Sequence, residues 1–459
     1  MTQSSDAPYP SRLYSWYVVC LLTAAYAISL LDRWILSLLV GPVKAHFGVS
    51  DTQMGLLMGA WFAVFYVTMG LPFGWLADRY NRRTLIGVAM SFWCVMTACC
   101  GLAKSFGQLA AARLGIGLGE AALTPAANSI IADLFPRAEQ SRAISIFNMG
   151  ISMGMGIAYL VGGLIVAWMA TRPPLVLPVL GALEPWQFVF VLAGAPGLLI
   201  AALLFTIREP LRRERLARTQ SETSVGHCLA YLRRNRAAYA PLMIGMVTSP
   251  LIGYAWQWLP TMFDRVWGWK AAQFSFAYGW ILLIFGPAGA IAGGMIASRL
   301  YRAGRKNAPF VGMLIALVVM VITSTLLPLM PSANAAILIL IPATVAGAMS
   351  SACGAAAAVF AAPGEFRAQV TSIYVLTING FGLLVGPWAV GFMNDHLFTD
   401  AGGVRYSLAV VALVCGGALT LYALTGQQAY GATVARLEAA QNASDLANRG
   451  DHKVLSKPI

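Results

Sequence analysis

The chain has 459 residues, of which 58% are hydrophobic and only 11% are charged. Soluble domains carry about 25% charged residues, so this composition excludes an ordinary soluble protein and indicates a membrane protein. The formal net charge of +13 would suit nucleic acid as a partner, but the basic residues are spread over short segments, which argues against it.

Apolar runs recur along the whole chain, and each has about 20 residues, enough to cross roughly 30 Å of hydrocarbon as a helix. Helices are expected because lipid offers no hydrogen-bond partners to an unpaired backbone. We therefore predict an all-α membrane protein with twelve transmembrane helices. The predicted spans are residues 15–40, 53–77, 84–103, 107–134, 141–170, 187–207, 239–263, 273–297, 308–330, 332–360, 368–394 and 403–426.

The basic residues predict the orientation of the chain. Twelve spans place both termini on one side, and with that side cytoplasmic the cytoplasmic segments, together with Arg142 at the adjoining end of the fifth span, hold 23 of the 31 Lys and Arg residues. Short cytoplasmic loops are enriched in these residues, so we predict a multi-pass protein with both termini in the cytoplasm. The same charges would attract anionic membrane lipids. Arg12 is the single base before the first apolar run and no small-residue cleavage site follows that run, so no cleaved signal peptide is expected.

Four charged residues lie well inside predicted spans, away from the span ends: Asp32 and Arg33 in the first, and Arg113 and Glu120 in the fourth. A charged side chain near the bilayer centre costs on the order of 3 kcal/mol, so such groups normally face a wet cavity and one another. Arg113 and Glu120 are seven residues apart, which puts them about 20° apart around a helix and about 10 Å apart along it. Counted from the outer ends of the spans, Asp32 lies at a depth between these two. We predict that the four residues form the working site.

The chain divides around residues 208–238, a stretch between the sixth and seventh spans that carries eight arginines. Its apolar pattern suits an amphipathic helix at the inner membrane surface, and a solvated loop is the alternative. A weak internal repeat supports two halves, because residues 74–83 resemble residues 294–306 after the eighth span. We predict an N-terminal six-helix bundle at 1–207, a cytoplasmic linker at 208–238, a C-terminal six-helix bundle at 239–426 and a cytoplasmic tail at 427–459.

The segment Gly74-Trp-Leu-Ala-Asp78-Arg79-Tyr-Asn-Arg82 resembles the signature loop of the major facilitator superfamily, which is Gly-x-Leu-x-Asp-Arg followed by a basic cluster. The resemblance implies the major facilitator fold, with two pseudo-symmetric six-helix bundles that carry a solute by alternating access. Gly74 would allow close helix approach, and Asp78 could hold the N-terminus of a helix in the opposite half through charge and dipole. We predict that Gly74, Asp78, Arg79 and Arg82 form a conformational latch. The alternative is a loop that only marks the cytoplasmic side, and in the second copy Ser298 replaces the acid.

Four segments together resemble the Spinster-like branch of that superfamily: 31–34, 49–56, 74–82 and 113–121. This resemblance, which covers the N-terminal half best, implies a bacterial-type homologue of exporters of lysolipids such as sphingosine 1-phosphate, placed in a bacterial inner membrane and coupled to protons. It also implies that the acids and arginines within the spans correspond to the membrane acids and arginines of the family. The glycine-rich fifth span lacks the proline that is usual in antiporters, which leaves symport and antiport open.

We predict that Asp32, Glu120 and Arg113 couple transport to protons. Asp32 would pair with Arg113 in one state and leave Glu120 free to take a proton, because a nearby guanidinium favours a charged carboxylate whereas burial disfavours it. A buried ion-pair network that only holds the helices together is the alternative. Arg33 points about 100° away from Asp32, and it either binds an anionic headgroup of the substrate or snorkels to the outer interface. Arg33, Arg113 and Glu120 are therefore also predicted to bind substrate.

The C-terminal half has no ionisable residue that we place in mid-membrane. Its candidates for substrate contact are the aromatic residues Tyr254, Trp256 and Trp258 of the seventh span. A charged wall that faces an aromatic wall suits an amphipathic solute, although interfacial aromatic residues are common in any membrane protein.

Catalytic and cofactor motifs do not favour an enzyme. Residues 150–154 match G-x-S-x-G, but that motif needs a strand-to-helix elbow and a histidine partner, and here it lies in a predicted membrane helix. No P-loop is visible, and the seven cysteines have no metal-binding spacing. We predict no catalytic residues, no cofactor and no metal.

The sequence therefore predicts a monomeric, proton-coupled secondary transporter of an amphipathic, lipid-like solute. Two alternatives stay open. The first is a proton-coupled symporter of a soluble organic anion, which would have a compact and hydrated site. The second is a non-transporting membrane sensor or enzyme.

Overall fold

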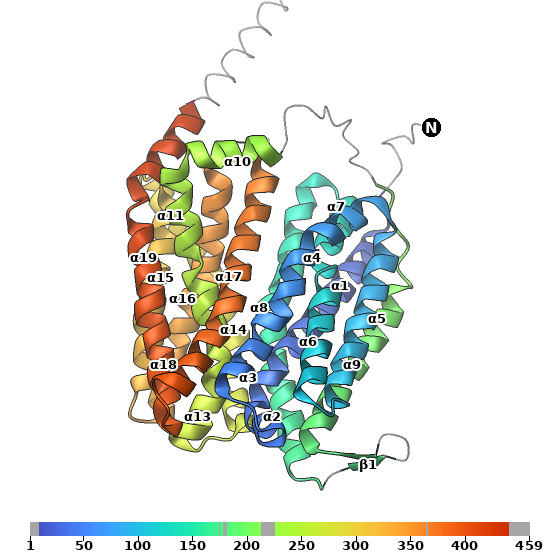
Figure 1. Cartoon of the computed structure of the whole chain (residues 1–459). Coiled ribbons are helices and arrows are strands. Elements are labelled where there is room, and N and C mark those ends of the chain that lie inside the picture. The colour runs from blue at the N-terminus through green and yellow to red at the C-terminus, as the bar shows by residue number, and fades with distance from the viewer. Residues whose placement is uncertain (1–8, 174, 178–180, 213–224, 364–365, 440–459) are drawn as a thin grey trace, which may run out of the picture.

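The computed structural model describes residues 9–173, 175–177, 181–212, 225–363 and 366–439, and two groups of helices stand side by side in it (Figure 1). The first group contains α1 (Arg12–Trp34), α2 (Val40–Phe47), α3 (Asp51–Met58), α4 (Ala60–Arg79), α5 (Arg82–Gly101), α6 (Phe106–Glu120), α7 (Leu123–Leu134), α8 (Arg137–Ala170) and α9 (Pro185–Leu204). The second group contains α11 (Arg236–Met246), α12 (Thr248–Ala255), α13 (Leu259–Trp267), α14 (Ala271–Arg302), α15 (Ala308–Leu326), α16 (Ala333–Phe360), α17 (Arg367–His396), α18 (Val404–Val410) and α19 (Gly417–Leu424).

Shorter elements complete the structure. Tight helical turns extend or link the helices at η1 (Ile35–Leu38), η2 (Trp256–Trp258), η3 (Leu327–Leu329) and η5 (Ala401–Gly403), and a π-helix, η6 (Val411–Gly416), joins α18 to α19. The strands β1 (Leu175–Leu177) and β2 (Gly181–Leu183) form an antiparallel hairpin in which Leu175 faces Leu183. This hairpin is a small addition to the predicted all-α class. The helix α10 (Val225–Arg234) lies across one end of the second group (Figure 1).

The two groups of helices meet towards one end of the molecule. We call the end that carries α7 and α10 the inner end, and the end that carries α2, α13 and the hairpin the outer end (Figure 1). Contacts between the groups are made mainly by α3 with α17 and by α8 with α14. The larger apolar core contains side chains of both groups, whereas a smaller core is confined to the second group and α10. The two groups of helices are thus packed against each other towards the outer end.

The helices agree with the predicted spans. Eleven helical segments of the described residues are long and apolar enough to cross a membrane. They correspond to eleven of the twelve predicted spans. The remaining span, predicted at residues 107–134, is divided between α6 and α7, and neither part is long enough by itself. The chain still runs on in a helical conformation there, because Ala121 and Ala122 between the two helices keep helical dihedral angles.

The division of this fourth span has a local cause. Pro125 lies in the first turn of α7, and its nitrogen has no hydrogen to donate to the carbonyl four residues earlier. That carbonyl belongs to Ala121, which directly follows Glu120. The helix is therefore interrupted directly after Glu120, and proline is a usual cause of such a break.

The predicted domain boundaries stay predictions. Residues 213–224 of the predicted linker and residues 440–459 of the predicted tail lie outside the described residues. The described end of the linker forms α10, where Cys228 is buried and the Tyr231 hydroxyl donates to the backbone oxygen of Ala361 at 3.1 Å. The tail continues as helix over residues 427–439.

Candidate functional site

The four charged residues of the predicted spans come together in the middle of the first group. Asp32 and Arg33 lie in the last turn of α1, and Arg113 and Glu120 lie on α6. Each is almost completely buried, with at most 5% of its surface exposed. Burial of charge at this depth is costly unless the groups are paired and hydrogen-bonded, so their partners decide what the site can do.

Arg33 and Glu120 form the ion pair of the site. Nη2 of Arg33 lies 2.6 Å from Oε2 of Glu120, and the Ser29 hydroxyl donates to the same oxygen at 2.6 Å. The other carboxylate oxygen of Glu120 is buried without a hydrogen-bond partner. The Arg33 guanidinium also lies over the rings of Phe62 and Tyr66, 4.5 and 4.7 Å from their centres, where cation–π attraction adds to the ion pair.

Arg113 does not pair with the Asp32 carboxylate in this structure. Its guanidinium donates to the backbone oxygens of Asp32 at 3.0 Å and Arg33 at 3.4 Å, which are carbonyls of the last turn of α1. Both carboxylate oxygens of Asp32 are buried without a hydrogen-bond partner at ordinary distance, and Thr97 and Trp93 of α5 are polar side chains close enough to interact with them. The predicted Asp32–Arg113 pair is thus absent in this conformation, because the Asp32 side chain faces α5 while the guanidinium reaches the backbone.

Arg33 takes a different direction from Asp32, as the helical spacing predicts, but the alternative of snorkelling to the interface is wrong. The side chain is 6% exposed and is enclosed by the Glu120 carboxylate and two rings. Its Nη1 reaches the hydroxyl of Tyr254 in the second group at 3.5 Å. Contact of Arg33 with a substrate headgroup stays a prediction.

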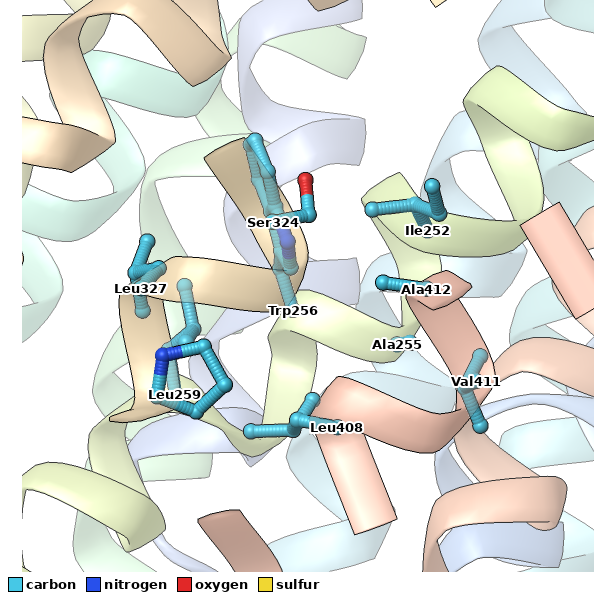
Figure 2. Close-up of a pocket in the computed structure, with 10 residues that line it drawn as sticks. Ile252, Ala255, Trp256, Leu259, Ser324, Leu327, Leu408, Val411 and Ala412 are labelled. Carbon is cyan, nitrogen blue, oxygen red and sulfur yellow. The ribbon is translucent and has the colours of Figure 1, made fainter. Parts of the chain in front are cut away.

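The three aromatic candidates of the seventh span lie in different surroundings. The hydroxyl of Tyr254 reaches Arg33 in the charged site. The Tyr254 ring is stacked against the Trp34 ring, with 6.3 Å between the ring centres. Trp256 lines an apolar pocket inside the second group, together with Ser324 and Leu408 (Figure 2). Trp258 is fully buried and donates from its indole nitrogen to the backbone oxygen of Pro387 at 2.9 Å. The chain changes from the α-helix α12 to the tighter turn of η2 between Tyr254 and Trp256. This change alters the directions of the three side chains, so their spacing in the sequence does not predict their different surroundings.

Sequence reasoning missed several residues of the site. Ser29 is three and four residues before Asp32 and Arg33, so its place on the same face of α1 was a usable signal. Phe62 and Tyr66 belong to α4, and their approach to Arg33 depends on how two helices pack, which has no local signal in the sequence. Buried polar and charged groups nevertheless need partners such as hydroxyl groups, so side chains of this kind were to be expected near the four charges.

Gly74, Asp78 and Arg79 of the predicted latch lie towards the inner end of α4, and Arg82 begins α5; among the described residues we find no hydrogen bond or ion pair from them to the second group. Arg82 is buried and pairs with Asp133 at 2.5 Å and Glu209 at 2.7 Å. The Arg79 guanidinium lies 3.9 Å from the centre of the Trp75 ring, and we find no hydrogen bond or ion pair of Asp78 to another described residue. A Cβ on Gly74 would meet no atom within 4 Å. The proposed latch is thus not engaged in this conformation, and its role stays a prediction.

A second polar cluster, which the sequence did not lead us to expect, lies at the outer end between the two groups. The Asp51 carboxylate pairs with Arg265 at 2.7 Å and with Lys44, and it accepts a hydrogen bond from Asn394 at 2.8 Å. The signal was present, because Asp51 follows the capping serine of α3 and Asn394 precedes Asp395 at the end of the eleventh span. These bonds join helices of the two groups at the outer end. The described residues contain no group of three or more His, Cys, Asp or Glu residues that could hold a metal ion.

Comparison with known proteins places this geometry in a family. Residues 22–387 match the model of the Major Facilitator Superfamily. An MFS-type efflux pump of Mycolicibacterium smegmatis is 24% identical over 416 residues, which cover 90% of this chain and 92% of that protein. Sphingosine-1-phosphate transporter SPNS2 of Xenopus tropicalis is 29% identical over 165 residues, 34% of this chain and 32% of that protein. The chain thus spans about a third of the length of that relative.

A solved structure extends the similarity to the whole fold. The crystal structure of a bacterial homologue of the human lysosomal transporter Spinster, in an inward-facing and unoccupied conformation, has 27% sequence identity with this chain. The TM-score is 0.74, and the match covers 96% of this chain and 98% of that one. These findings confirm the predicted fold class, with transport rather than catalysis as the function. The chain belongs to the Major Facilitator Superfamily, and it is a Spinster-like transporter of that family.

Proposed function

We propose that the protein is a proton-coupled secondary transporter that carries an amphipathic, lipid-like solute by alternating access. The observation that carries this proposal is the balance of charges in the buried site. Two acids and two arginines are present, but a single side-chain ion pair, Arg33 with Glu120, is formed between them. A purely structural network would be expected to satisfy its acids, since each unpaired buried charge is costly.

Asp32 and Glu120 are the candidates to take up protons. Asp32 is buried beside no cation that binds its carboxylate, and Glu120 keeps one oxygen without a partner. Neutralisation by a proton removes the cost of burying such a charge. In the outward-facing state, Arg113 would exchange its backbone contacts for the Asp32 carboxylate, which completes the switch predicted for this pair.

The Arg33 side chain links proton binding to movement of the two groups. It binds Glu120 in the first group and reaches Tyr254 in the second. A proton on Glu120 would weaken the ion pair and release Arg33, either to an anionic part of the substrate or to Tyr254. Because the guanidinium presents several donors in a fixed plane, it suits a phosphate or carboxylate headgroup.

The surroundings of Arg33 support an amphipathic cargo. Phe62, Tyr66, Trp34 and Tyr254 place aromatic surface next to the charge. A headgroup at Arg33 and an apolar tail along these rings would satisfy both. The similarity to a sphingosine-1-phosphate transporter supports a cargo of this class. We also propose that the protein acts as a monomer in a bacterial inner membrane, with both termini in the cytoplasm.

Proton movement in liposomes tests the proposal. Purified protein is reconstituted in liposomes that contain a pH-sensitive dye, and a lysolipid with a phosphate headgroup or a short organic acid is added outside. We expect the lysolipid to drive proton movement in the wild type. In Asp32→Asn and Glu120→Gln the signal should fall to the level of empty liposomes. Asp264→Asn, which changes an exposed acid at the outer end, is the matched control and should behave as the wild type.

Two results would count against the proposal in different ways. Normal lysolipid-dependent proton movement in both membrane variants would remove the coupling role of the acids. Proton movement driven by the short organic acid, without competition from lysolipid, would identify a symporter of soluble anions instead.

A further inference from the structure

The first turn of α3 is held by a carboxylate from the other group of helices. The backbone N–H groups of Asp51 and Thr52 donate to the two carboxylate oxygens of Asp395, at 3.1 and 2.7 Å. A helix leaves its first N–H groups without intrahelical partners, and they form the positive end of its dipole. Both carboxylate oxygens of Asp395, a residue of the second group, thus bind the positive N-terminal end of α3 in the first group.

Asp51 makes a second joint at the same place. Its side chain accepts two hydrogen bonds from Arg265, at 2.7 and 2.9 Å, and one from Asn394. Both partners belong to the second group, whereas Asp51 belongs to the first. The Asp51 side chain is only 3% exposed, and charge-assisted hydrogen bonds of this kind are stronger than neutral ones.

The backbones touch where these bonds form. A Cβ on Gly391 of α17 would lie 2.2 Å from the backbone oxygen of Asp51, and one on Gly59 would lie 2.4 Å from the backbone oxygen of Leu383. Only glycine permits such an approach. The outer ends of α3 and α17 are therefore packed and bonded at once.

The inner end of α4, the helix that follows α3, is not joined to the inner end of α17 in this way. Asp78 lies at the end of α4, and α17 begins at Arg367 after Phe366, which makes no side-chain cap. We find no bond between Asp78 and a described residue of α17, and a Cβ on Gly74 would meet open space. The segment α3–α4 is thus bonded to α17 at the outer end, and we find no such bond at the inner end among the described residues.

The two acids occupy equivalent positions. The segment α3–α4 runs from the outer to the inner end and α17 runs back (Figure 1), so the C-terminal end of each is at the same end of the molecule as the N-terminal end of the other. Asp395 is the next-to-last residue of α17, and Asp78 is the next-to-last residue of α4. We propose that Asp395 is a positioning residue for transport that latches the outer end closed, and that Asp395 and Asp78 latch the same two helices alternately. The inference rests on the proposed function only for the alternating-access cycle.

Distances between spin labels test this directly. Labels are introduced as unnatural amino acids, which leaves the native cysteines in place, in full-length protein in lipid nanodiscs. Lys104 and Leu397 form an outer pair across the two groups, and Tyr80 and Arg302 form an inner pair; all four positions are exposed. The measurement needs neither a substrate nor a proton gradient. A failure of this inference is therefore distinguishable from a failure of the proposed coupling.

We expect the wild type to show mainly short outer distances. Asp395→Asn should raise the population with long outer distances about tenfold, the size expected for loss of a charge-assisted hydrogen bond. Adding Asp78→Asn to that variant should move the population back, because both latches are then weakened. Asp400→Asn is the control, since Asp400 caps Gly402 within its own group.

An unchanged outer distance distribution in a folded Asp395→Asn protein overturns the inference. If that variant does not fold, Asp395→Glu keeps the charge but moves the carboxylate away from the N–H groups of Asp51 and Thr52, and it gives the same test. A change in melting temperature without a change in distances would show that Asp395 only stabilises the fold, which also overturns it.

Discussion

At the scale of residues, the chemistry of the candidate site depends on which charged side chains form pairs. Sequence spacing correctly predicted that Asp32 and Arg33 point in different directions, because helical geometry fixes that angle. It could not show that Arg33 pairs with Glu120, since the pairing depends on how α1 is rotated against α6. Sequence spacing also could not show that the Tyr66 ring of α4 lies beside the Arg33 guanidinium. Spacing along one helix thus locates charges, and packing between helices selects their partners.

The Arg33–Glu120 pair gives a stability prediction. Arg33→Gln leaves Glu120 buried without its cation, and loss of one partner of a buried pair costs about 3–5 kcal/mol. We expect a clear fall in melting temperature, measured by circular dichroism in detergent. Adding Glu120→Gln should recover most of this loss, because the uncompensated charge is then gone. Arg172→Gln, at an exposed arginine, should change the stability by no more than about 0.5 kcal/mol; equal stability of Arg33→Gln and this control would contradict the role of the pair.

At the scale of elements, the helices were largely predictable and their interruptions were not. Hydrophobic length located the spans, because lipid demands continuous helical hydrogen bonding. The break between α6 and α7 had a local signal in Pro125, which a length criterion ignores. The close approach of α3 to α17 had only glycines as its signal, and glycines are frequent throughout this chain. Such contacts require the partner helix to be known.

The α3–α17 contact predicts a contrast between two glycines. A Cβ on Gly55 would lie 2.5 Å from the backbone oxygen of Pro387, whereas one on Gly107 would meet nothing within 4 Å. Gly55→Ala should therefore destabilise the closed outer end by about 1–3 kcal/mol through overpacking. Gly107→Ala should be neutral or slightly stabilising. Thermal unfolding followed by tryptophan fluorescence measures both, and a stable Gly55→Ala protein with unchanged distances at the outer end would show that the contact is looser than described.

At the scale of the whole molecule, composition and charge predicted a membrane transporter fold, and the family match confirms it. The conformation could not be predicted. The two states of a transporter differ by only a few kcal/mol, so the same sequence encodes both. The balance lies in contacts such as that of Asp51 with Arg265, which join segments 214 residues apart in the sequence.

The proposed orientation is tested by reporter fusions. Alkaline phosphatase requires disulfides and so becomes active only outside the cytoplasm. A fusion after Lys104 should be active and a fusion after Asn81 inactive, because the first falls in a predicted external loop and the second in a cytoplasmic one. A green fluorescent protein at the C-terminus should fluoresce if that end is cytoplasmic. The reverse pattern of phosphatase activity would invert the predicted topology.

The contact of Arg113 with the end of α1 has a consequence for the order of events in transport. The last turn of a helix carries a partial negative charge on its unpaired carbonyls, and Arg113 binds two of these. The helix itself thus serves as the counter-charge of this buried arginine. Either acid can then gain or lose a proton without leaving Arg113 uncompensated. In this conformation Arg113 therefore anchors the end of α1 without using a carboxylate, and under the proposed coupling a proton could reach either acid before Arg113 exchanges its backbone contacts.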